Sequence, residues 1–173
     1  MKVVLASGVA ALCASAVAPP IAFVVAPRGG APGARWVKTV KLDELPEDRP
    51  RKVKIVSDER DAWKLEKDAE LGAVWLVRNG DAVRALSVVC PHLGCSIDAS
   101  GEGKGFACPC HDSSFDPSGK RETGPSPRDM DALETRVVDG VVEVDFRRFR
   151  QGTRERVEVS AKRDVARGKV EVG

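Results

Sequence analysis

The chain has 173 residues, of which 42% are hydrophobic and 31% are charged. This length and composition suit one ordinary hydrophobic core, so we expect a single domain with appendages rather than two full domains. The formal net charge is only +2, which excludes a chain that is basic throughout and binds nucleic acid by its overall charge.

Residues 1–26 are predicted to be a transmembrane anchor. Val3 to Ala26 form a run of 24 residues without a charge, which at about 1.5 Å per residue would cross a hydrocarbon layer of about 30 Å as a helix. The alternative is a secretory signal cleaved after residues 16–18, Ala-Val-Ala, which have the small-x-small pattern of a cleavage site. Both interpretations export the rest of the chain. We interpret Cys13 as a bystander within the apolar run.

Residues 27–35 are predicted to be a flexible hinge linker. Their sequence, PRGGAPGAR, contains three glycines and two prolines and shows no apolar periodicity. Basic residues near this linker would lie on the exported side, against the positive-inside tendency, so we expect the natural start of the protein to lie upstream of Met1.

Short β-branched runs follow the linker and predict strands, at residues 36–42, 51–56, 73–77, 133–138 and 141–146. Asn79-Gly80 and Asp139-Gly140 have the composition of two-residue hairpin turns that need positive φ. Residues 58–70, DERDAWKLEKDAE, are expected to form a short helix or a charged loop, with Trp63 in the core.

Two segments, CPHLGC at 90–95 and CPCHDSSF at 108–115, hold four of the five cysteines and both histidines. Each can present one thiolate and one imidazole at a loop tip, and four such ligands bind a metal. The candidate ligands are Cys90, His92, Cys108 and His111. A structural zinc site is one interpretation. It leaves Cys95 and Cys110 unexplained, and in an exported protein these two could join as a disulfide between the loops.

The two segments closely resemble the cluster-binding boxes of Rieske iron–sulfur proteins. The resemblance implies an all-β fold, a Rieske-type antiparallel β-sandwich with a cluster-binding subdomain over residues 36–146, preceded by an N-terminal transmembrane helix. It also implies one 2Fe-2S cluster per chain, in which two Cys hold one iron and two His hold the other. The ligands implied are Cys90, His92, Cys108 and His111.

Further features resemble the Rieske proteins of quinol-oxidising cytochrome bc complexes. In that subfamily the loops are joined by a disulfide, which Rieske ferredoxins and ring-hydroxylating oxygenases typically lack; Cys95 and Cys110 match the pair. GPSP at 124–127 resembles the proline loop that covers the cluster, and Ser113 matches a serine that hydrogen-bonds a bridging sulfide. The residues implied to cover or tune the cluster are Leu93, Ser113, Phe115, Gly124, Pro125 and Pro127.

The sequence departs from the family pattern at two positions. Asp112 stands where the family usually has glycine, and Asp tolerates positive φ better than most residues. Phe115 stands where high-potential members have a tyrosine whose hydroxyl bonds a cluster cysteine. We therefore expect a lowered reduction potential, which suits menaquinol better than ubiquinol.

The resemblance implies an electron-transfer subunit of a quinol:cytochrome c oxidoreductase. His111, with His92 beside it, is expected to accept a hydrogen bond from quinol at cytochrome b, and the electron then passes to a c-type cytochrome. Leu93 is expected to pack against the partner, and the linker at 27–35 to let the domain swing between sites. The expected location is an energy-transducing membrane, such as the bacterial inner membrane, with the domain on the periplasmic side.

Residues 147–173 are predicted to be a basic C-terminal tail, since they carry nine Lys or Arg and four Asp or Glu, a net charge of +5. The tail is expected to be solvated, or else to contact a partner or anionic lipid. Two other functions stay open, a soluble Rieske ferredoxin that feeds an oxygenase and a zinc-stabilised binding module. The disulfide cysteines and the apolar N-terminus speak against the ferredoxin.

Overall fold

The computed structural model describes residues 36–60, 65–101, 104–159 and 164–166. This described part is built from antiparallel strands and a single short 3-10 turn, η1 (Leu42–Glu44). No helix within it is long and apolar enough to cross a membrane. The predicted anchor at 1–26 and the linker at 27–35 lie outside the described residues.

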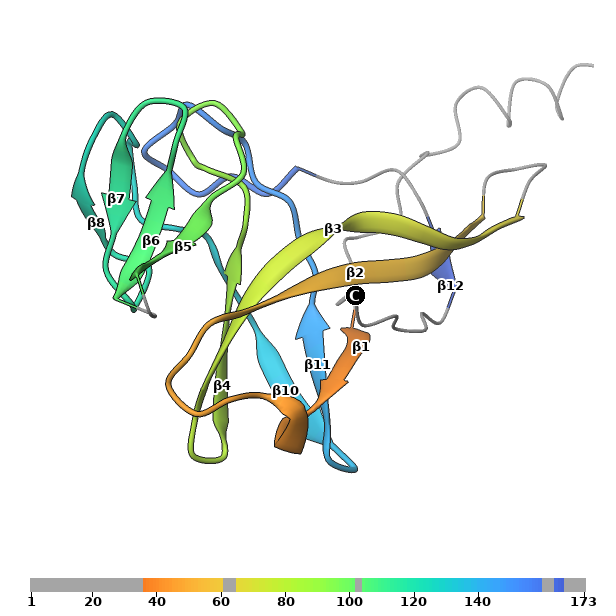
Figure 1. Ribbon diagram of the computed structural model, residues 1–173. Helices are drawn as coiled ribbons and strands as arrows, with labels where there is room; N and C mark the ends of the chain where they lie inside the picture. The colour runs from red at the N-terminus through yellow and green to blue at the C-terminus, as the bar shows by residue number, and fades with distance from the viewer. Residues whose placement is uncertain (1–35, 61–64, 102–103, 160–163, 167–173) are drawn as a thin grey trace, which may run out of the picture. The chain divides into compact units, whose positions relative to one another are not determined.

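Two antiparallel sheets form the base of the domain (Figure 1). The first has the order β1-β11-β10 and consists of β1 (Trp36–Lys41), β10 (Thr135–Val138) and β11 (Val141–Asp145). The second has the order β12-β2-β3-β4-β9 and consists of β2 (Arg51–Arg60), β3 (Leu65–Asn79), β4 (Ala82–Ser87), β9 (Ala132–Leu133) and β12 (Asp164–Ala166). Their buried side chains form one hydrophobic core, which includes Val37, Val142 and Val144 from the first sheet and Ile55, Val74 and Leu76 from the second.

A third sheet of four strands stands beside the base and carries the cysteine- and histidine-rich segments. It has the order β5-β6-β7-β8, with β5 (Asp98–Ser100), β6 (Gly105–Cys108), β7 (Ser113–Phe115) and β8 (Arg121–Thr123). A second core joins it to the base. Trp75 of β3 belongs to this core, and its indole N–H donates to the Ile97 carbonyl at 3.0 Å. Strand β3 of the base therefore holds the segment that leads into β5, the first strand of the third sheet.

The predicted strands are confirmed, with two changes of extent. The strands predicted at 51–56 and 73–77 belong to the longer strands β2 and β3. The strand predicted at 133–138 is broken at Glu134, because Leu133 pairs with β4 while Thr135 pairs with β11. The chain thus passes from one base sheet to the other at that residue.

The expectation of a helix or charged loop at 58–70 is wrong for residues 58–60 and 65–70, and residues 61–64 lie outside the described residues. Residues 58–60 and 65–70 continue β2 and β3, which pair as far as Glu59 with Glu66 and Arg60 with Leu65. The register shifts along this ladder, so polar and apolar residues do not alternate in the sequence as they do in a regular strand. The backbone hydrogen bonds between β2 and β3 make these residues strands all the same. Trp63 lies outside the described residues.

Both predicted hairpins form. Asp139 and Gly140 have φ of 51° and 75°, as a two-residue turn with two left-handed positions requires. In the other hairpin Asn79 pairs with Ala82, so the turn consists of Gly80 and Asp81, one residue later than predicted. Gly80 supplies the positive φ there, at 61°.

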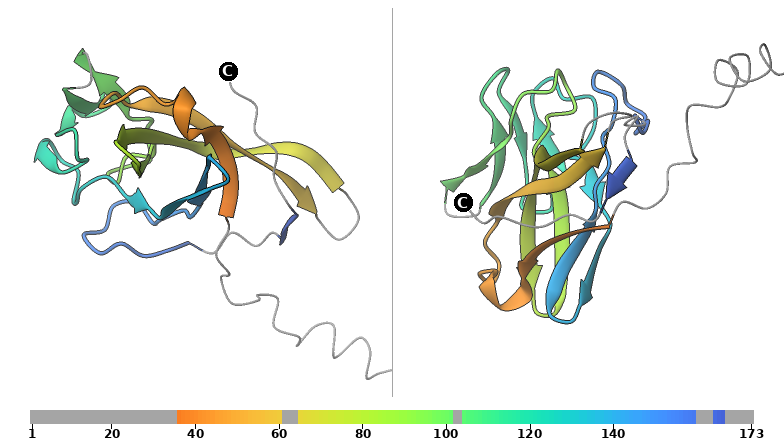
Figure 2. Two further views of the ribbon diagram at one scale, coloured as in Figure 1. Left: turned by 90° about the horizontal axis from the view of Figure 1, so that it is seen from below. Right: turned by 90° about the vertical axis from the view of Figure 1, so that its right-hand side faces the viewer.

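Residues 147–159, which we call the C-terminal arm, fold back against the domain (Figure 2). Phe149 is 6% exposed and belongs to the core of the base. The arm doubles on itself, with Phe149 bridged to Glu158 and the Arg150 N–H donating to the Val157 carbonyl at 2.9 Å. Core packing therefore continues beyond residue 146, the domain end expected from the sequence.

Candidate metal centre

The first loop, Cys90–Cys95, is a tight turn closed by its own backbone. The Cys90 N–H donates to the Cys95 carbonyl at 2.8 Å, and the Gly94 N–H donates to the Cys90 carbonyl at 3.0 Å. Gly94 has φ of 83°, which a residue with a side chain rarely adopts. Leu93 and Gly94, at the tip of the turn, are exposed, whereas Pro91 is buried. We call this segment loop 1.

The second loop, residues 109–112, connects β6 to β7. It is closed by the cross-strand pair of Cys108 and Ser113. Asp112 has φ of 55°, so the residue that replaces the usual glycine adopts the left-handed conformation expected of it. We call this segment loop 2.

The structure places the four candidate ligands in two pairs. Cys90 and Cys108 are 1% and 3% exposed, and their thiols lie within hydrogen-bond reach of each other. The rings of His92 and His111 meet edge to face with their centroids 4.8 Å apart. His92 is half-buried and His111 is exposed. The site thus has a thiol side in the protein interior and an imidazole side at the surface.

The electrostatics of the thiol side fit a cation. Burial raises the pKa of Cys90 to about 11, and the neighbouring Cys108 thiol raises it too, while the backbone N–H of His92 lowers it. A buried thiol with a raised pKa stays protonated unless a metal ion compensates the negative charge of its thiolate. Two buried thiols beside two imidazoles match the mixed ligand set of a Rieske cluster.

Cys95 and Cys110 are joined in a disulfide that links loop 1 to loop 2, as the resemblance implied. The sulfurs of Cys95, Cys108 and Cys110 lie within 4.8 Å of one another. A disulfide sulfur is not a thiolate and does not serve as an ordinary metal ligand. Of these three, only Cys108 is free to bind a metal, and Cys90 is the other free thiol among the described residues.

The proline loop packs directly on loop 2. Gly124 has φ of 86°, and a Cβ on it would lie 2.4 Å from the Ser113 Cα. The Ser126 N–H donates to the Ser113 Oγ at 3.1 Å. This leaves the Ser113 hydroxyl proton free to donate to another acceptor. Pro125 is exposed and Pro127 is half-buried on the outer side of the loop.

Leu93 and Phe115 differ in their exposure to solvent. Leu93 is 65% exposed at the tip of loop 1, an unusual position for a leucine next to a half-buried histidine. Phe115 is 1% exposed and belongs to the second core, together with Cys90 and Cys108. Leu93 is therefore available to a partner, whereas Phe115 can act only on the interior of the site.

Sequence reasoning missed several residues that support the loops. Trp75 anchors the exit of loop 1 from a distance of 22 residues. Arg128 and Asp131 form a buried ion pair beside the proline loop, with 2.8 Å between the Arg128 Nη2 and the Asp131 Oδ2. No local motif marks these residues. The sequence offers one signal for this ion pair, the arginine that directly follows the proline loop.

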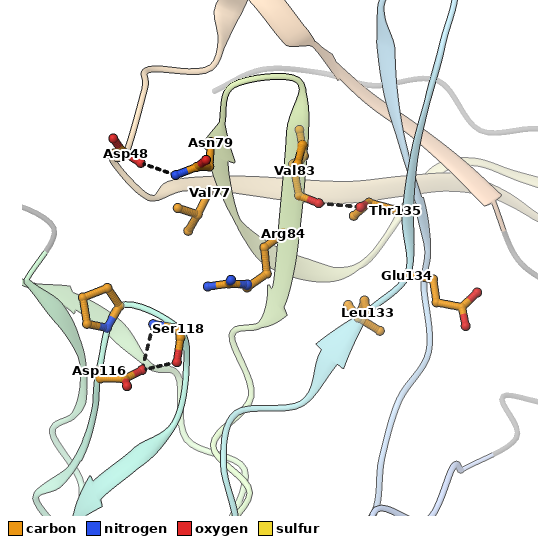
Figure 3. Close-up of a pocket in the computed structure, with 12 residues that line it drawn as sticks. Asp48, Val77, Asn79, Val83, Arg84, Asp116, Ser118, Leu133, Glu134 and Thr135 are labelled. Atoms are coloured by element: carbon orange, nitrogen blue, oxygen red, sulfur yellow. Dashed lines mark hydrogen bonds between the residues drawn. The ribbon is translucent and has the colours of Figure 1, made fainter.

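A separate cavity of about 870 Å³ lies on another part of the domain (Figure 3). Val77, Arg84 and Leu133 line it from the base, and the turn at Asp116 closes its other side. The Asp116 carboxylate accepts hydrogen bonds from the Ser118 hydroxyl and two backbone N–H groups, which lower its pKa. None of the four candidate ligands lines this cavity.

Comparison with known proteins gives consistent matches. The family model for the Rieske [2Fe-2S] domain matches residues 35–138. The menaquinol:cytochrome c reductase iron-sulfur subunit of Bacillus subtilis (strain 168) is 31% identical over 134 residues, which cover 75% of this chain and 78% of that protein. The cytochrome b6-f complex iron-sulfur subunit 1, cyanelle, of Cyanophora paradoxa is 31% identical over 157 residues, 85% of this chain but only 65% of that protein. A chain of the solved hyperthermophilic respiratory Complex III is 20% identical with a TM-score of 0.47, covering 82% of this chain and 99% of that one.

Proposed function

Because the chain belongs to the Rieske [2Fe-2S] domain family, we propose that it is the iron–sulfur subunit of a quinol-oxidising cytochrome bc complex. In this role it takes electrons from quinol at cytochrome b and passes them to a c-type cytochrome. One observation carries the proposal: two loops joined by a disulfide hold two imidazoles whose rings meet and two buried free thiols. The disulfide favours this function over a soluble Rieske ferredoxin.

We assign the cluster ligands by burial. Cys90 and Cys108 would hold the inner iron, because their thiolates need a positive charge in the interior. His92 and His111 would hold the outer iron, because each imidazole binds through one nitrogen and keeps the other toward solvent. The Ser113 hydroxyl, oriented by the Ser126 N–H, would donate to the cluster.

When bound, the cluster supplies one-electron chemistry that is coupled to the basicity of its histidine ligands. The exposed His111 would accept a hydrogen bond from the quinol hydroxyl and take its proton. His92, edge to face with His111, fixes the orientation of that ring. Leu93 packs against the partner at the same surface and excludes water from the contact.

The proposed subunit sits in an energy-transducing membrane, with the domain on the exported side and anchored by residues 1–26. The quinol site and the c-type cytochrome are different places, so the domain has to move between them. The glycine- and proline-rich linker at 27–35 supplies the reach for that motion.

Leu93→Glu is expected to lower quinol turnover at least tenfold in the complex purified through a tag on this chain. The leucine side chain is 65% exposed in the free domain, and its burial against a partner is worth about 1.5–3 kcal/mol. A charge at this position forfeits that burial, but it replaces no candidate ligand and keeps the residue 93 N–H that lies beside the Cys90 thiol. The cluster is therefore expected to stay bound, which the visible spectrum measures. Quinol:cytochrome c reductase activity is the measurement, with Leu93→Met as the matched control.

Normal turnover by Leu93→Glu would remove the docking role of loop 1. If the tagged wild-type chain were purified without any cytochrome and instead reduced an oxygenase, the ferredoxin alternative would replace the proposal.

Phe115→Tyr is expected to raise the reduction potential by tens of millivolts. Phe115 is buried in the same core as Cys90 and Cys108, so a hydroxyl on its ring adds a donor on the sulfur side of the site. One hydrogen bond favours the reduced state by about 1 kcal/mol, and 59 mV corresponds to about 1.4 kcal/mol for one electron. Ser113→Ala should shift the potential in the opposite direction.

Protein-film voltammetry at one pH measures both shifts. A potential that stays constant or falls in Phe115→Tyr, with the cluster intact, would show that the hydroxyl does not reach a cluster sulfur. The inference of a low-potential quinol such as menaquinol would then lose its basis.

A further inference from the structure

Arg128 lies at a junction between the proline loop and the C-terminal arm. Its side chain is only 10% exposed. Nε and Nη2 donate to the two carboxylate oxygens of Asp131 at 2.9 and 2.8 Å. Nη1 donates to the Thr153 carbonyl at 2.5 Å, and Nη2 also donates to the Arg150 carbonyl at 2.9 Å. The planar guanidinium therefore binds a carboxylate on one edge and two carbonyls of the arm on another.

Between those two carbonyls the arm contacts loop 1. The Gly152 N–H donates to the Pro91 carbonyl at 2.8 Å, and Gly152 has φ of 73°. Pro91 is fully buried and lies between Cys90 and His92, the two candidate ligands of loop 1. The backbone of loop 1 is thus held from outside at the residue that separates its two ligands.

The same arginine is connected to loop 2. The Ser126 hydroxyl donates to the Arg128 carbonyl at 2.8 Å, while the Ser126 N–H donates to the Ser113 Oγ at 3.1 Å. A continuous set of hydrogen bonds therefore runs from β7 through the proline loop and Arg128 to the arm, and from Gly152 to loop 1. The disulfide joins the two loops directly, and this set of hydrogen bonds joins them a second time through the proline loop and the arm.

We propose that Arg128 is a positioning residue, which clamps the C-terminal arm so that Gly152 holds loop 1 and the His92 ligand in place. The clamp deepens the proposed function, because it acts on the same site. A ligand set works when it is held within about 0.5 Å of its required geometry, and a six-residue turn with an exposed tip needs outside support to meet that demand. The arm supplies the support from a segment whose sequence indicates only a basic tail.

Arg128→Lys tests the clamp in the full-length chain with its cluster. Lysine keeps the positive charge beside Asp131 but lacks the planar fork, so the two carbonyls of the arm lose their donors. We expect hydrogen exchange at the Gly152 amide and iron release to a chelator to become at least about tenfold faster, since the loss of one hydrogen bond already corresponds to about that factor. We also expect broader EPR lines and a shifted reduction potential, which loss of global stability alone would not produce.

Arg147→Lys is the matched control. Arg147 is an ion-paired arginine of the arm itself, and its ion-pair partners, Asp145 and Glu158, lie outside the proline loop and loop 1. Its replacement should lower thermal stability and leave the EPR spectrum, the potential and the rate of iron release unchanged.

Gly152→Val provides an independent test that leaves the Arg128–Asp131 ion pair intact. A β-branched residue is strained at φ of 73°, so the arm is expected to move away from Pro91. Asparagine tolerates this conformation, so Gly152→Asn should keep the wild-type rate of iron release. The clamp would be overturned if, in the isolated chain, Arg128→Lys or Gly152→Val sped hydrogen exchange at the amide of residue 152 but left the EPR spectrum and iron release unchanged. Failure of the proposed function has a different signature, the absence of quinol turnover in the wild-type complex.

Discussion

Gly124→Ala is expected to destabilise the protein by about 4 kcal/mol and to lower its thermal midpoint by about 10 °C. Gly124 has φ of 86°, and a Cβ there would lie 2.4 Å from the Ser113 Cα and 2.7 Å from the Asp112 carbonyl oxygen. These are backbone atoms, which cannot turn away as a flexible side chain can. The proline loop would have to lift off loop 2 and break the bond from Ser126 to Ser113. Thermal unfolding followed by circular dichroism measures the loss.

Gly140→Ala is the matched control for this prediction. Gly140 also has positive φ, at 75°, but a Cβ on it would meet nothing within 4 Å. Only the backbone strain remains, which is about 1 kcal/mol. Equal decreases of the thermal midpoint in Gly124→Ala and Gly140→Ala would mean that the proline loop is not packed tightly against loop 2.

Removal of the disulfide, by Cys95→Ser together with Cys110→Ser, is expected to cost about 3 kcal/mol and to cause loss of the cluster. The bond closes a span of 15 residues between the loops that carry the candidate ligands. Both residues are replaced because a lone Cys110 thiol would lie within 4.8 Å of Cys108 and compete for the metal. Iron content and visible absorbance of the purified protein measure the outcome.

Cys13→Ser is the control here, since Cys13 lies outside both loops. It should keep the full iron content. Thiol counting under denaturing, non-reducing conditions, after iron removal, should find Cys95 and Cys110 blocked in the wild-type protein. Two free thiols at these positions, or a double serine variant with its cluster intact, would contradict the structural role of the bond.

Features encoded by neighbouring residues were predicted well from the sequence. The Asp139-Gly140 turn depends on two residues that tolerate positive φ, and the structure has both in that conformation. Asp112 shows that the left-handed position of loop 2 persists without glycine. The spacing of cysteine and histidine in two loops was sufficient to indicate a metal centre, because the ligand types themselves carry the chemistry.

Features that depend on distant contacts were not predicted. The charged residues at 58–60 and 65–70 have no strand periodicity of their own, and they belong to strands because β2 and β3 pair along their length. The C-terminal arm has the composition of a solvated tail, yet Phe149 is buried in the core and Gly152 bonds to Pro91 across 61 residues of chain. Such contacts form only when the fold brings distant segments together, so no local sequence pattern predicts them.

Hyperfine spectroscopy of the reduced, full-length protein with 15N-labelled histidine tests the central claim most directly. The chain contains two histidines in all, so any histidine nitrogen that couples to the cluster belongs to His92 or to His111. The account predicts two irons per chain and two directly coordinating histidine nitrogens, one from each residue. A zinc ion in place of iron, or a cluster with no histidine nitrogen coupled to it, would contradict the ligand assignment and the function built on it.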